Sequence, residues 1–217
     1  MTDRPLFAVL MGGPLTPTPR LMAQVASARV VAADGGMRHA QALGVTPEVW
    51  VGDFDSTPPD LIAAWPQVVR EPYPPAKNET DGEIAVAAAL ERGAKRLVLA
   101  GALGGERSDH AFMHFLYAAR LAETGIDVLL TSGDEEARPL LPGTLDIDLP
   151  KSSLFSVLGL DTLAGLTIEG ARYPLKDFHL PFGSSRTVSN VAEGPIRLTL
   201  SSGRALVLAR PYDLSGA

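Results

Sequence analysis

The stretch Val49-Trp50-Val51-Gly52-Asp53-Phe54-Asp55-Ser56 joins a short apolar run directly to two carboxylates. The run predicts a buried strand, which places both aspartates at its carboxyl end, the edge where open α/β sheets bind ligands. Two carboxylates this close repel each other, so the pattern favours a divalent cation held between them and a phosphate. The alternative is that Asp55-Ser56 only caps the next helix. Capping explains one of these residues and leaves Asp53 unexplained.

Composition limits the class of protein. The chain has 217 residues, 46% of them apolar and 20% charged, as in a globular protein of one large or two small domains. Its net charge of −6 disfavours a general nucleic-acid binder, and the lack of cysteine excludes disulfides, thiolate metal sites and a cysteine nucleophile. No apolar segment approaches the roughly 20 residues of a membrane helix, and the first residues lack the pattern of a secretory signal. We therefore expect a cytoplasmic protein that binds neither nucleic acid nor membrane.

The first half of the chain alternates short apolar runs with helical segments, which predicts a parallel sheet covered by helices on both faces. The predicted strands are Leu6–Met11, Arg29–Ala33, Val49–Val51, Val68–Val69, Arg96–Ala100 and Val128–Thr131. The predicted helices are Pro19–Ser27, Met37–Leu43, Pro59–Trp65, Asp81–Arg92 and His110–Thr124. The helix at Asp81 is the best marked, because Thr80 and Glu83 form a capping box.

The rhythm changes near Gly133, where short β-type runs separated by Gly, Pro and Ser begin. These runs are Leu145–Leu149, Leu154–Leu158, Leu166–Ile168, Thr187–Val191, Ile196–Leu200 and Ala205–Ala209. Several short strands in succession predict a β-sandwich or a small barrel. The expected fold is of the α/β class: an N-terminal α/β domain with a parallel sheet over residues 1–135, then an all-β sandwich domain over residues 140–217.

Glycines and acids follow several predicted strands of the first half. They are Asp34 with Gly35 and Gly36, the pair Asp53 and Asp55, the helix start Asp81, and Gly101 with Gly104 and Gly105, which lead through Arg107 to Asp109 and His110. Strand ends of a parallel sheet face one crevice, so we expect these groups to meet. Glycines let backbone N–H groups approach an anion, and an arginine can clamp a phosphate with two hydrogen bonds.

Each of these signals has an ordinary explanation when it is taken alone. The glycine pairs are typical of tight turns. An acid such as Asp81 is favoured in the first turn of any helix. Lys77 fits a phosphate contact and an ordinary exposed lysine equally well. Neither the P-loop pattern nor Gly-x-Gly-x-x-Gly is present, so nucleotide binding would use another arrangement.

The ordered set of motifs resembles the thiamine pyrophosphokinase family. The motifs of the first half are Ala33-Asp34-Gly35-Gly36, Gly52-Asp53-Phe54-Asp55-Ser56, Lys77-x-x-Thr80-Asp81, and Gly101-x-x-Gly104-Gly105 through Arg107-x-Asp109-His110. Those of the second half are Gly170-x-x-Tyr173-Pro174-Leu175, Ser189-Asn190 and a closing hairpin with Gly203. No single motif is decisive, but the ordered set is highly specific.

The resemblance implies transfer of a pyrophosphoryl group from ATP to the hydroxyethyl oxygen of thiamine, which gives thiamine diphosphate and AMP. It also implies that residues 1–135 bind nucleotide and Mg²⁺, that residues 140–217 bind thiamine, and that a homodimer forms with active sites at its interface. The implied Mg²⁺ ligands are Asp53, Asp55 and Asp81, which with Arg107 form the catalytic set. The implied ATP-binding residues are Asp34, Gly35, Gly36, Lys77, Gly104, Gly105, Arg107, Asp109 and His110. The implied thiamine contacts are Thr80, Ser189 and Asn190.

The chain departs from the family pattern at two positions. Glu106 stands between Gly105 and Arg107, where the family commonly reads Gly-Gly-Arg-x-Asp-His, and Asn78 stands where many bacterial relatives have an aspartate. Three other functions stay open. They are a diphosphokinase for another alcohol such as a pterin, a nucleotide-sugar transferase that uses Asp53-x-Asp55 as its metal motif, and a thiamine or nucleotide sensor without turnover.

Overall fold

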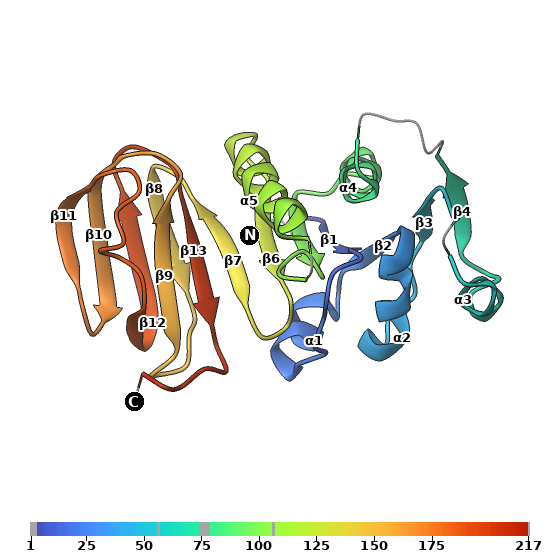
Figure 1. Ribbon diagram of the computed structural model, residues 1–217, viewed down its shortest axis with the longest axis horizontal. Coiled ribbons are helices and arrows are strands. Elements are labelled where there is room, and N and C mark those ends of the chain that lie inside the picture. The colour runs from blue at the N-terminus through green and yellow to red at the C-terminus, as the bar shows by residue number, and fades with distance from the viewer. Residues whose placement is uncertain (1–3, 56, 74–78, 106, 217) are drawn as a thin grey trace. The chain divides into compact units, whose positions relative to one another are not determined.

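The computed structural model describes residues 4–55, 57–73, 79–105 and 107–216 of the 217-residue chain. The fold is of the mixed α/β class and is built on a large sheet (Figure 1). Contacts divide the described chain into two compact units. The first comprises Met1–Ala111 and Gly125–Gly133, and the second comprises Phe112–Thr124 and Asp134–Ala217. Within the described ranges, no helix combines the length and apolar character needed to cross a membrane.

The first unit holds a parallel sheet in the strand order β6-β5-β1-β2-β3-β4. Its strands are β1 (Leu6–Leu10), β2 (Arg29–Ala33), β3 (Val49–Gly52), β4 (Val69–Pro72), β5 (Arg96–Ala100) and β6 (Asp127–Thr131). The chain starts in the middle of the sheet at β1, runs outward to β4 and returns to β5 on the other side of β1. The strand order therefore reverses between β1 and β5, and open α/β sheets bind their ligands beside such a reversal.

Helices follow the strands of this unit along the chain. They are α1 (Pro19–Val25), the 3₁₀ helix η1 (Asp34–His39), α2 (Ala40–Leu43), α3 (Pro59–Ala64) and α4 (Asp81–Glu91). Figure 1 shows α1 and α2 on one face of the parallel sheet and α4 on the other. Side-chain caps fix two of the helix starts. Thr18 accepts the Leu21 N–H at the start of α1, and the predicted Thr80–Glu83 capping box is present at the start of α4.

The predicted helix Met37–Leu43 is wrong in its first part. A 3₁₀ turn over Asp34–His39 comes first, and the α-helix covers only Ala40–Leu43. Gly36 explains the tight turn, because a Cβ there would lie 2.2 Å from the carbonyl oxygen of Leu10. The predicted strand Val68–Val69 is also displaced to Val69–Pro72, where it pairs with β3.

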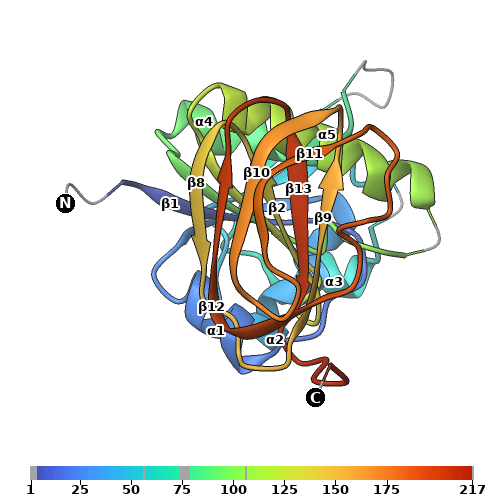
Figure 2. The same ribbon diagram turned by 90° about the vertical axis from the view of Figure 1, so that its left-hand side faces the viewer.

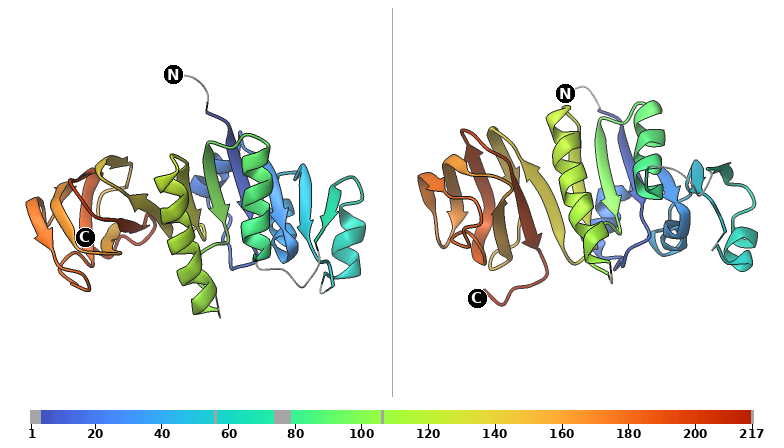
Figure 3. Two further views of the ribbon diagram at one scale, coloured as in Figure 1. Left: turned by 90° about the horizontal axis from the view of Figure 1, so that it is seen from above. Right: turned by 45° about the horizontal axis from the view of Figure 1, so that its top comes forward.

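The core of the first unit forms on both faces of the sheet. One face packs α1, η1 and α2 against Leu10, Ala32 and Trp50, all with 0% exposure. The other face meets α4, whose buried residues are mostly alanines. Small side chains let α4 lie close to β1, β2 and β3, as Figure 3 shows. The helix α5 (Ser108–Glu123) starts two residues before the predicted His110, and its residues from Phe112 onward belong to the second unit.

The second unit is built from antiparallel strands, which face the viewer in Figure 2. They are β7 (Glu136–Leu140), β8 (Gly143–Ile147), β9 (Leu154–Gly159), β10 (Leu163–Ala171), β11 (Leu175–Leu180), β12 (Asn190–Leu200) and β13 (Ala205–Arg210). One ladder runs β7-β13-β9-β12, and another joins β8, β12, β10 and β11. Apolar residues from all seven of these strands form a shared core.

The strand β12 differs from the prediction of two separate runs, Thr187–Val191 and Ile196–Leu200. It is continuous from Asn190 to Leu200 because it serves both ladders. Asn190 and Val191 pair with β9, Ile196–Leu200 pair with β8, and β10 pairs with both parts of the strand. Gly194 and Pro195, which resemble a break in the sequence, lie between these two parts. The strands β7 and β11 were not predicted, since Pro139 interrupts the first and Lys176-Asp177 the second.

Candidate functional site

The strand ends bring the acidic residues of the first half to one edge of the parallel sheet. Ala33 of β2 pairs with Val51 of β3, so Asp34 and Asp53 leave neighbouring strands at nearly the same level. The strand β5 ends level with β1, which places Gly101 at that edge too. The predicted meeting of strand-end groups therefore has a direct basis in the register.

The loops after β1 and β5 touch each other where the strand order reverses. The Gly13 N–H donates to the carbonyl oxygen of Gly101 at 3.0 Å, and a Cβ at Gly13 would lie 2.4 Å from that oxygen. Gly105 lies against the ring of Pro14, with its would-be Cβ 3.2 Å from Cδ. Gly104 and Gly105 both have a positive φ and are exposed. Glycine is needed at Gly13 and Gly101, because the two backbones approach too closely there to leave room for a Cβ.

Asp34 is held in a strained turn by two side chains of the β3 segment. Its φ is +39°, a region that is uncommon outside glycine, although aspartate enters it more readily than most residues. The indole Nε1–H of Trp50 donates to its main-chain carbonyl oxygen at 2.8 Å, and the hydroxyl of Thr57 donates to its Oδ1 at 3.2 Å. Trp50 is fully buried and Thr57 is 9% exposed. The Asp34 carboxylate is therefore fixed relative to the loop that carries Asp53 and Asp55.

The loop Asp53-Phe54-Asp55 turns its aromatic residue inward and carries a carboxylate on either side of it. Phe54 packs edge-on against Trp50, with ring centroids 5.1 Å apart and an interplanar angle of 79°. Its φ of +61° is strained for an aromatic residue and costs about 1–3 kcal/mol. The Asp55 N–H donates to Asp53 Oδ1 at 3.2 Å. Asp53 is half-buried and Asp55 is exposed.

Asp81 begins α4, the helix that packs on β1, β2 and β3. Its side chain is half-buried, and it lies in the first turn, where the helix dipole favours an acid. The neighbouring Thr80 uses its hydroxyl and N–H in the capping box, with both groups bonded to Glu83. Thr80 therefore has a structural role, and its predicted contact with thiamine stays a prediction.

The three aspartates predicted to hold Mg²⁺ come from two segments: Asp53 and Asp55 lie on one loop, and Asp81 begins α4. In the described part of the chain, no group of three or more His, Cys, Asp and Glu side chains is positioned to hold a metal ion. The donor set still suits Mg²⁺, because this ion binds through one or two carboxylates together with substrate phosphates and water, not in an all-protein cage. Asp53 and Asp55 on one fixed loop supply such a pair. The assignment of Asp81 as a third ligand stays a prediction.

Arg107 and Asp109 form an ion pair at the start of α5. The guanidinium donates to both carboxylate oxygens, Nε to Oδ1 at 3.0 Å and Nη2 to Oδ2 at 2.8 Å. This hydrogen bonding holds the pKa of Asp109 well below its usual range and raises that of Arg107. Both side chains are about two-thirds exposed, and His110 beside them is exposed. The predicted clamp on a phosphate would require Arg107 to exchange this partner.

The predicted thiamine contacts of the second unit lie where β12 begins. Ser189 is exposed and has a φ of +59°. Asn190 is 5% exposed, and its amide is bonded to the backbone of Tyr173, with Tyr173 N–H to Oδ1 at 3.1 Å and Nδ2 to the Tyr173 oxygen at 2.9 Å. Oδ1 also accepts the Val191 N–H at 2.8 Å. Asn190 thus fixes the corner that presents Ser189 and Tyr173.

Four residues that the sequence motifs singled out, Ser56, Lys77, Asn78 and Glu106, lie outside the described residues. Other residues at the edge were not predicted. Trp50 and Thr57 read as an ordinary core residue and a loop residue. Arg38 and His39 fell inside the predicted helix Met37–Leu43. Gly12 and Gly13 did carry a signal, because a Gly-Gly pair directly after a strand repeats the pattern of Gly35 and Gly36.

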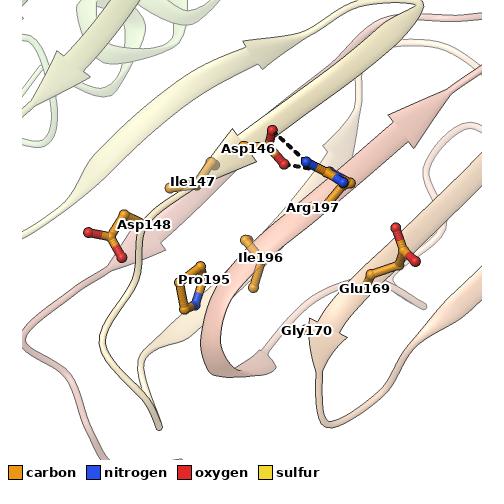
Figure 4. A pocket seen from close by; sticks show the side chains of 8 residues that line it. All are labelled: Asp146, Ile147, Asp148, Glu169, Gly170, Pro195, Ile196 and Arg197. Atoms are coloured by element: carbon orange, nitrogen blue, oxygen red, sulfur yellow. Dashed lines mark hydrogen bonds and ion pairs between the residues drawn. The ribbon is translucent and has the colours of Figure 1, made fainter.

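A hollow of about 630 Å³ lies in the second unit among β8, β10 and β12 (Figure 4). Its lining includes the acids Asp146, Asp148 and Glu169 and one cation, Arg197. Arg197 already makes a two-point ion pair with Asp146, with contacts at 2.7 and 3.1 Å. This charge pattern disfavours an anionic ligand such as a nucleotide, and the hollow is lined by none of the described residues that were predicted to bind ATP.

Comparisons with known proteins identify relatives over nearly the whole chain. Residues 22–130 match the family model of the thiamin pyrophosphokinase catalytic domain, and residues 144–205 match that of the thiamin pyrophosphokinase vitamin B1 binding domain. The thiamine pyrophosphokinase of Bacillus subtilis is 26% identical over 189 residues, which cover 84% of this chain and 87% of the relative.

Solved structures give the same result. The thiamin pyrophosphokinase of Geobacillus thermodenitrificans is 28% identical with a TM-score of 0.82, over 98% of this chain and 100% of that one. The thiamine pyrophosphokinase of Bacillus subtilis shares the fold, with a TM-score of 0.84 at 23% identity over 95% of this chain and 99% of that one.

Proposed function

The chain belongs to the thiamine pyrophosphokinase family, and on this premise we propose that it transfers a pyrophosphoryl group from ATP to the hydroxyethyl oxygen of thiamine. The products are thiamine diphosphate and AMP. As a member of this family the chain is an ATP-dependent pyrophosphoryl transferase. The matches cover both parts of the chain, so they support a donor site and an acceptor site in one protein.

The observation that carries the proposal is the joining of two acidic loops at the carboxyl edge of the parallel sheet. Trp50 and Thr57 both bond to Asp34, and Phe54 packs on Trp50 between Asp53 and Asp55. Positive φ at Asp34 and at Phe54 is strain that the surrounding contacts must hold in place. Strained backbone is found preferentially at functional sites, and here it lies beside two carboxylates that a metal-bound polyphosphate could reach.

The reaction needs positioning more than covalent help from the protein. The alcohol oxygen attacks the β-phosphorus in line, the bond from that phosphorus to the α–β bridging oxygen breaks, AMP leaves and the alcohol loses its proton. Asp53 and Asp55, with Asp81 as the third proposed ligand, would hold Mg²⁺, which neutralises phosphate charge when it is bound. Asp34 and the glycine loops after β1, β2 and β5 would orient the nucleotide. Holding both reactants in line supplies a large part of the rate.

The two parts of the chain have different proposed roles. We assign nucleotide and Mg²⁺ binding to residues 1–135 and thiamine binding to a β-sandwich domain over residues 140–217. The family-model matches at 22–130 and 144–205 support this division. Ser189 is the proposed thiamine contact of the second part, and Asn190 would act by fixing the backbone around it.

A homodimer with shared active sites is also part of the proposal. Its structural support is an apolar surface on α5, where Phe112, Met113 and Leu116 are 57%, 55% and 37% exposed. Large apolar side chains gathered on one helix often mark an interface. Light scattering of the purified protein would give the mass in solution, and Met113→Glu would be expected to lower it to that of a monomer. We place the enzyme in the cytoplasm, where its donor ATP is supplied.

The test of the proposed function is a steady-state assay of AMP release with ATP, Mg²⁺ and thiamine. Release of AMP that depends on thiamine, with thiamine diphosphate as the second product, would support the proposal. Turnover with a pterin alcohol but not with thiamine would indicate the alternative diphosphokinase. Release of a nucleoside diphosphate from a sugar donor would indicate a nucleotide-sugar transferase. Tight thiamine or ATP binding without AMP would indicate a sensor.

A further inference from the structure

Three acids at the carboxyl edge of the parallel sheet lie on one side of the strand reversal. Asp34, Asp53 and Asp55 follow β2 and β3, while the loops after β1 and β5 contribute glycines and Pro14. A triphosphate carries about four negative charges near neutral pH, and Mg²⁺ offsets only part of them. A cation on the glycine side would complete the arrangement. Arg107 on this side is already paired with Asp109, so another arginine would have to supply the charge.

That arginine is Arg38, which the 3₁₀ helix η1 carries back over the glycine loops. Its Nη2 donates to the carbonyl oxygens of Gly12 and Gly13, the second at 3.3 Å. Its Nη1 would lie 3.5 Å from a Cβ placed on Gly35. The guanidinium therefore lies over glycines from the loops after β1 and β2, beside the strand reversal where α/β sheets bind ligands.

His39 strengthens this placement from the next position of the same turn. Its Nε2 lies 2.9 Å from the carbonyl oxygen of Gly13. Burial lowers the pKa of His39, and the charge of Arg38 lowers it further against the opposing effect of the carbonyl. The neutral ring with its proton on Nε2 donates to Gly13. Arg38 and His39 thus both contact the Gly12-Gly13 carbonyls. Because the His39 ring is neutral, Arg38 is the positively charged member of the two.

Part of the Arg38 guanidinium remains available for a ligand. Arginine has five N–H donors in a planar fork. Within the part of the chain that the structure describes, only Nη2 of Arg38 is hydrogen-bonded, so Nη1 and Nε still have donors to offer. The side chain is exposed. An exposed fork anchored at one nitrogen loses little entropy when the others bind an anion, and phosphate is the anion that this geometry matches best.

We propose that Arg38 binds a phosphate group of the nucleoside triphosphate at the β1–β5 reversal, at the same edge of the sheet as the carboxylates proposed to hold Mg²⁺. This inference rests on the proposed function for the identity of the ligand, and it adds to that function a phosphate contact outside the motifs. The competing explanation is that Arg38 only clips the Gly12-Gly13 loop through its carbonyls. The two explanations differ in which ligand they affect.

The experiment measures the binding of ATP, inorganic tripolyphosphate and adenosine to the full chain by calorimetry. Arg38→Gln should raise the Kd of ATP and of tripolyphosphate about 10- to 100-fold, as expected for loss of a charged hydrogen-bonding partner, and leave that of adenosine unchanged. Arg38→Lys keeps the charge but loses the planar arrangement of donors, so its Kd values should lie between those of the wild type and Arg38→Gln. Arg29→Gln is the matched control, because Arg29 also donates to a main-chain carbonyl but begins β2, at the opposite end of the strand from Asp34.

Equal Kd values for ATP in the wild type and Arg38→Gln would overturn the inference. An equal loss of affinity for ATP and adenosine together with a lower Tm would also overturn it. That result is expected if Arg38 only stabilises the Gly12-Gly13 loop. If Arg38→Gln does not fold, the comparison of Arg38→Lys across the same three ligands decides in the same way. Failure of the proposed function is separate: a wild-type chain that binds ATP through Arg38 but releases no AMP with thiamine would refute the function and leave the phosphate contact standing.

Discussion

The indole Nε1–H of Trp50 donates to the main-chain carbonyl oxygen of Asp34 at 2.8 Å. The same indole packs edge-on against Phe54, between Asp53 and Asp55. One fully buried side chain therefore joins the turn after β2 to the acidic loop after β3. Any shift of Trp50 would move both groups of carboxylates, although Trp50 itself has no exposed surface.

Replacing Trp50 with phenylalanine should keep the ring contact and remove the hydrogen bond. The partly buried Asp34 oxygen then loses its donor, which should lower the free energy of unfolding by about 1–3 kcal/mol. Activity at saturating substrates should fall as well, because the Asp34 turn is less firmly held. Urea unfolding and the AMP assay measure the two effects. Trp65→Phe changes the other tryptophan that packs on this core and is the control; equal behaviour of the two variants would contradict the role given to Trp50.

The hydroxyl of Thr57 offers a more conservative test of the same junction. It donates to Asp34 Oδ1 at 3.2 Å from a position that is 9% exposed. Thr57→Val keeps the shape and removes the donor, so kcat/KM for ATP should fall about 10-fold, the effect of one hydrogen bond to a charged group. Thr57→Ser keeps the hydroxyl and should restore most of the loss. A serine variant as impaired as the valine variant would show that packing, not the hydrogen bond, is what matters.

Much of this edge was predictable from the sequence, and the reasons are local. The strand before Asp53 is a run of buried residues followed by glycine, and the start of α4 is marked by Thr80 and Glu83 next to each other in the helix turn. Both patterns involve residues that are close together in the sequence. The parallel direction of the strands then follows from the alternation of strands and helices.

The contacts that hold the edge together could not be predicted in this way. Trp50 and Asp34 are 16 residues apart, and a tryptophan in an apolar run indicates burial without indicating its hydrogen-bond partner. Arg38 reads as the exposed face of a helix until the 3₁₀ turn is known. The strand β7 was missed because Pro139 argues against a strand, and its pairing with β13 is a tertiary effect.

The two glycines of the Asp34 turn should respond differently to alanine. A Cβ at Gly36 would lie 2.2 Å from the Leu10 carbonyl oxygen, a backbone atom that cannot move aside, whereas a Cβ at Gly35 would meet only Arg38 Nη1 at 3.5 Å. Gly36→Ala should therefore destabilise the fold by about 3 kcal/mol, the upper part of the range for overpacking. Gly35→Ala should be close to the wild type in urea unfolding. Similar stabilities for both variants would mean that the turn adapts.

The pH dependence of stability should include a contribution from His39. Burial lowers the pKa of His39 in the folded chain, so the unfolded chain binds this proton more tightly. The contribution of His39 to the free energy of unfolding is therefore fully present above the ordinary pKa of about 6.5 and is lost as the pH falls towards the folded value. Urea midpoints measured from pH 8 to pH 5 should fall less steeply in His39→Gln, which keeps a donor for Gly13. His179→Gln, on the exposed part of β11, should follow the wild type.

Asp55 provides the sharpest test of the metal assignment. Asp55→Asn keeps the shape of the side chain and removes its charge, so a metal-bound polyphosphate would lose an anionic ligand. At saturating Mg²⁺ the turnover should fall about 10²- to 10³-fold, which corresponds to several kcal/mol of transition-state stabilisation. Asp60→Asn is the control, since Asp60 is an exposed acid in the first turn of α3, in the same segment. Near-normal turnover of Asp55→Asn would show that Asp55 only begins the following segment. Asp53 would then be the remaining candidate metal ligand on this loop.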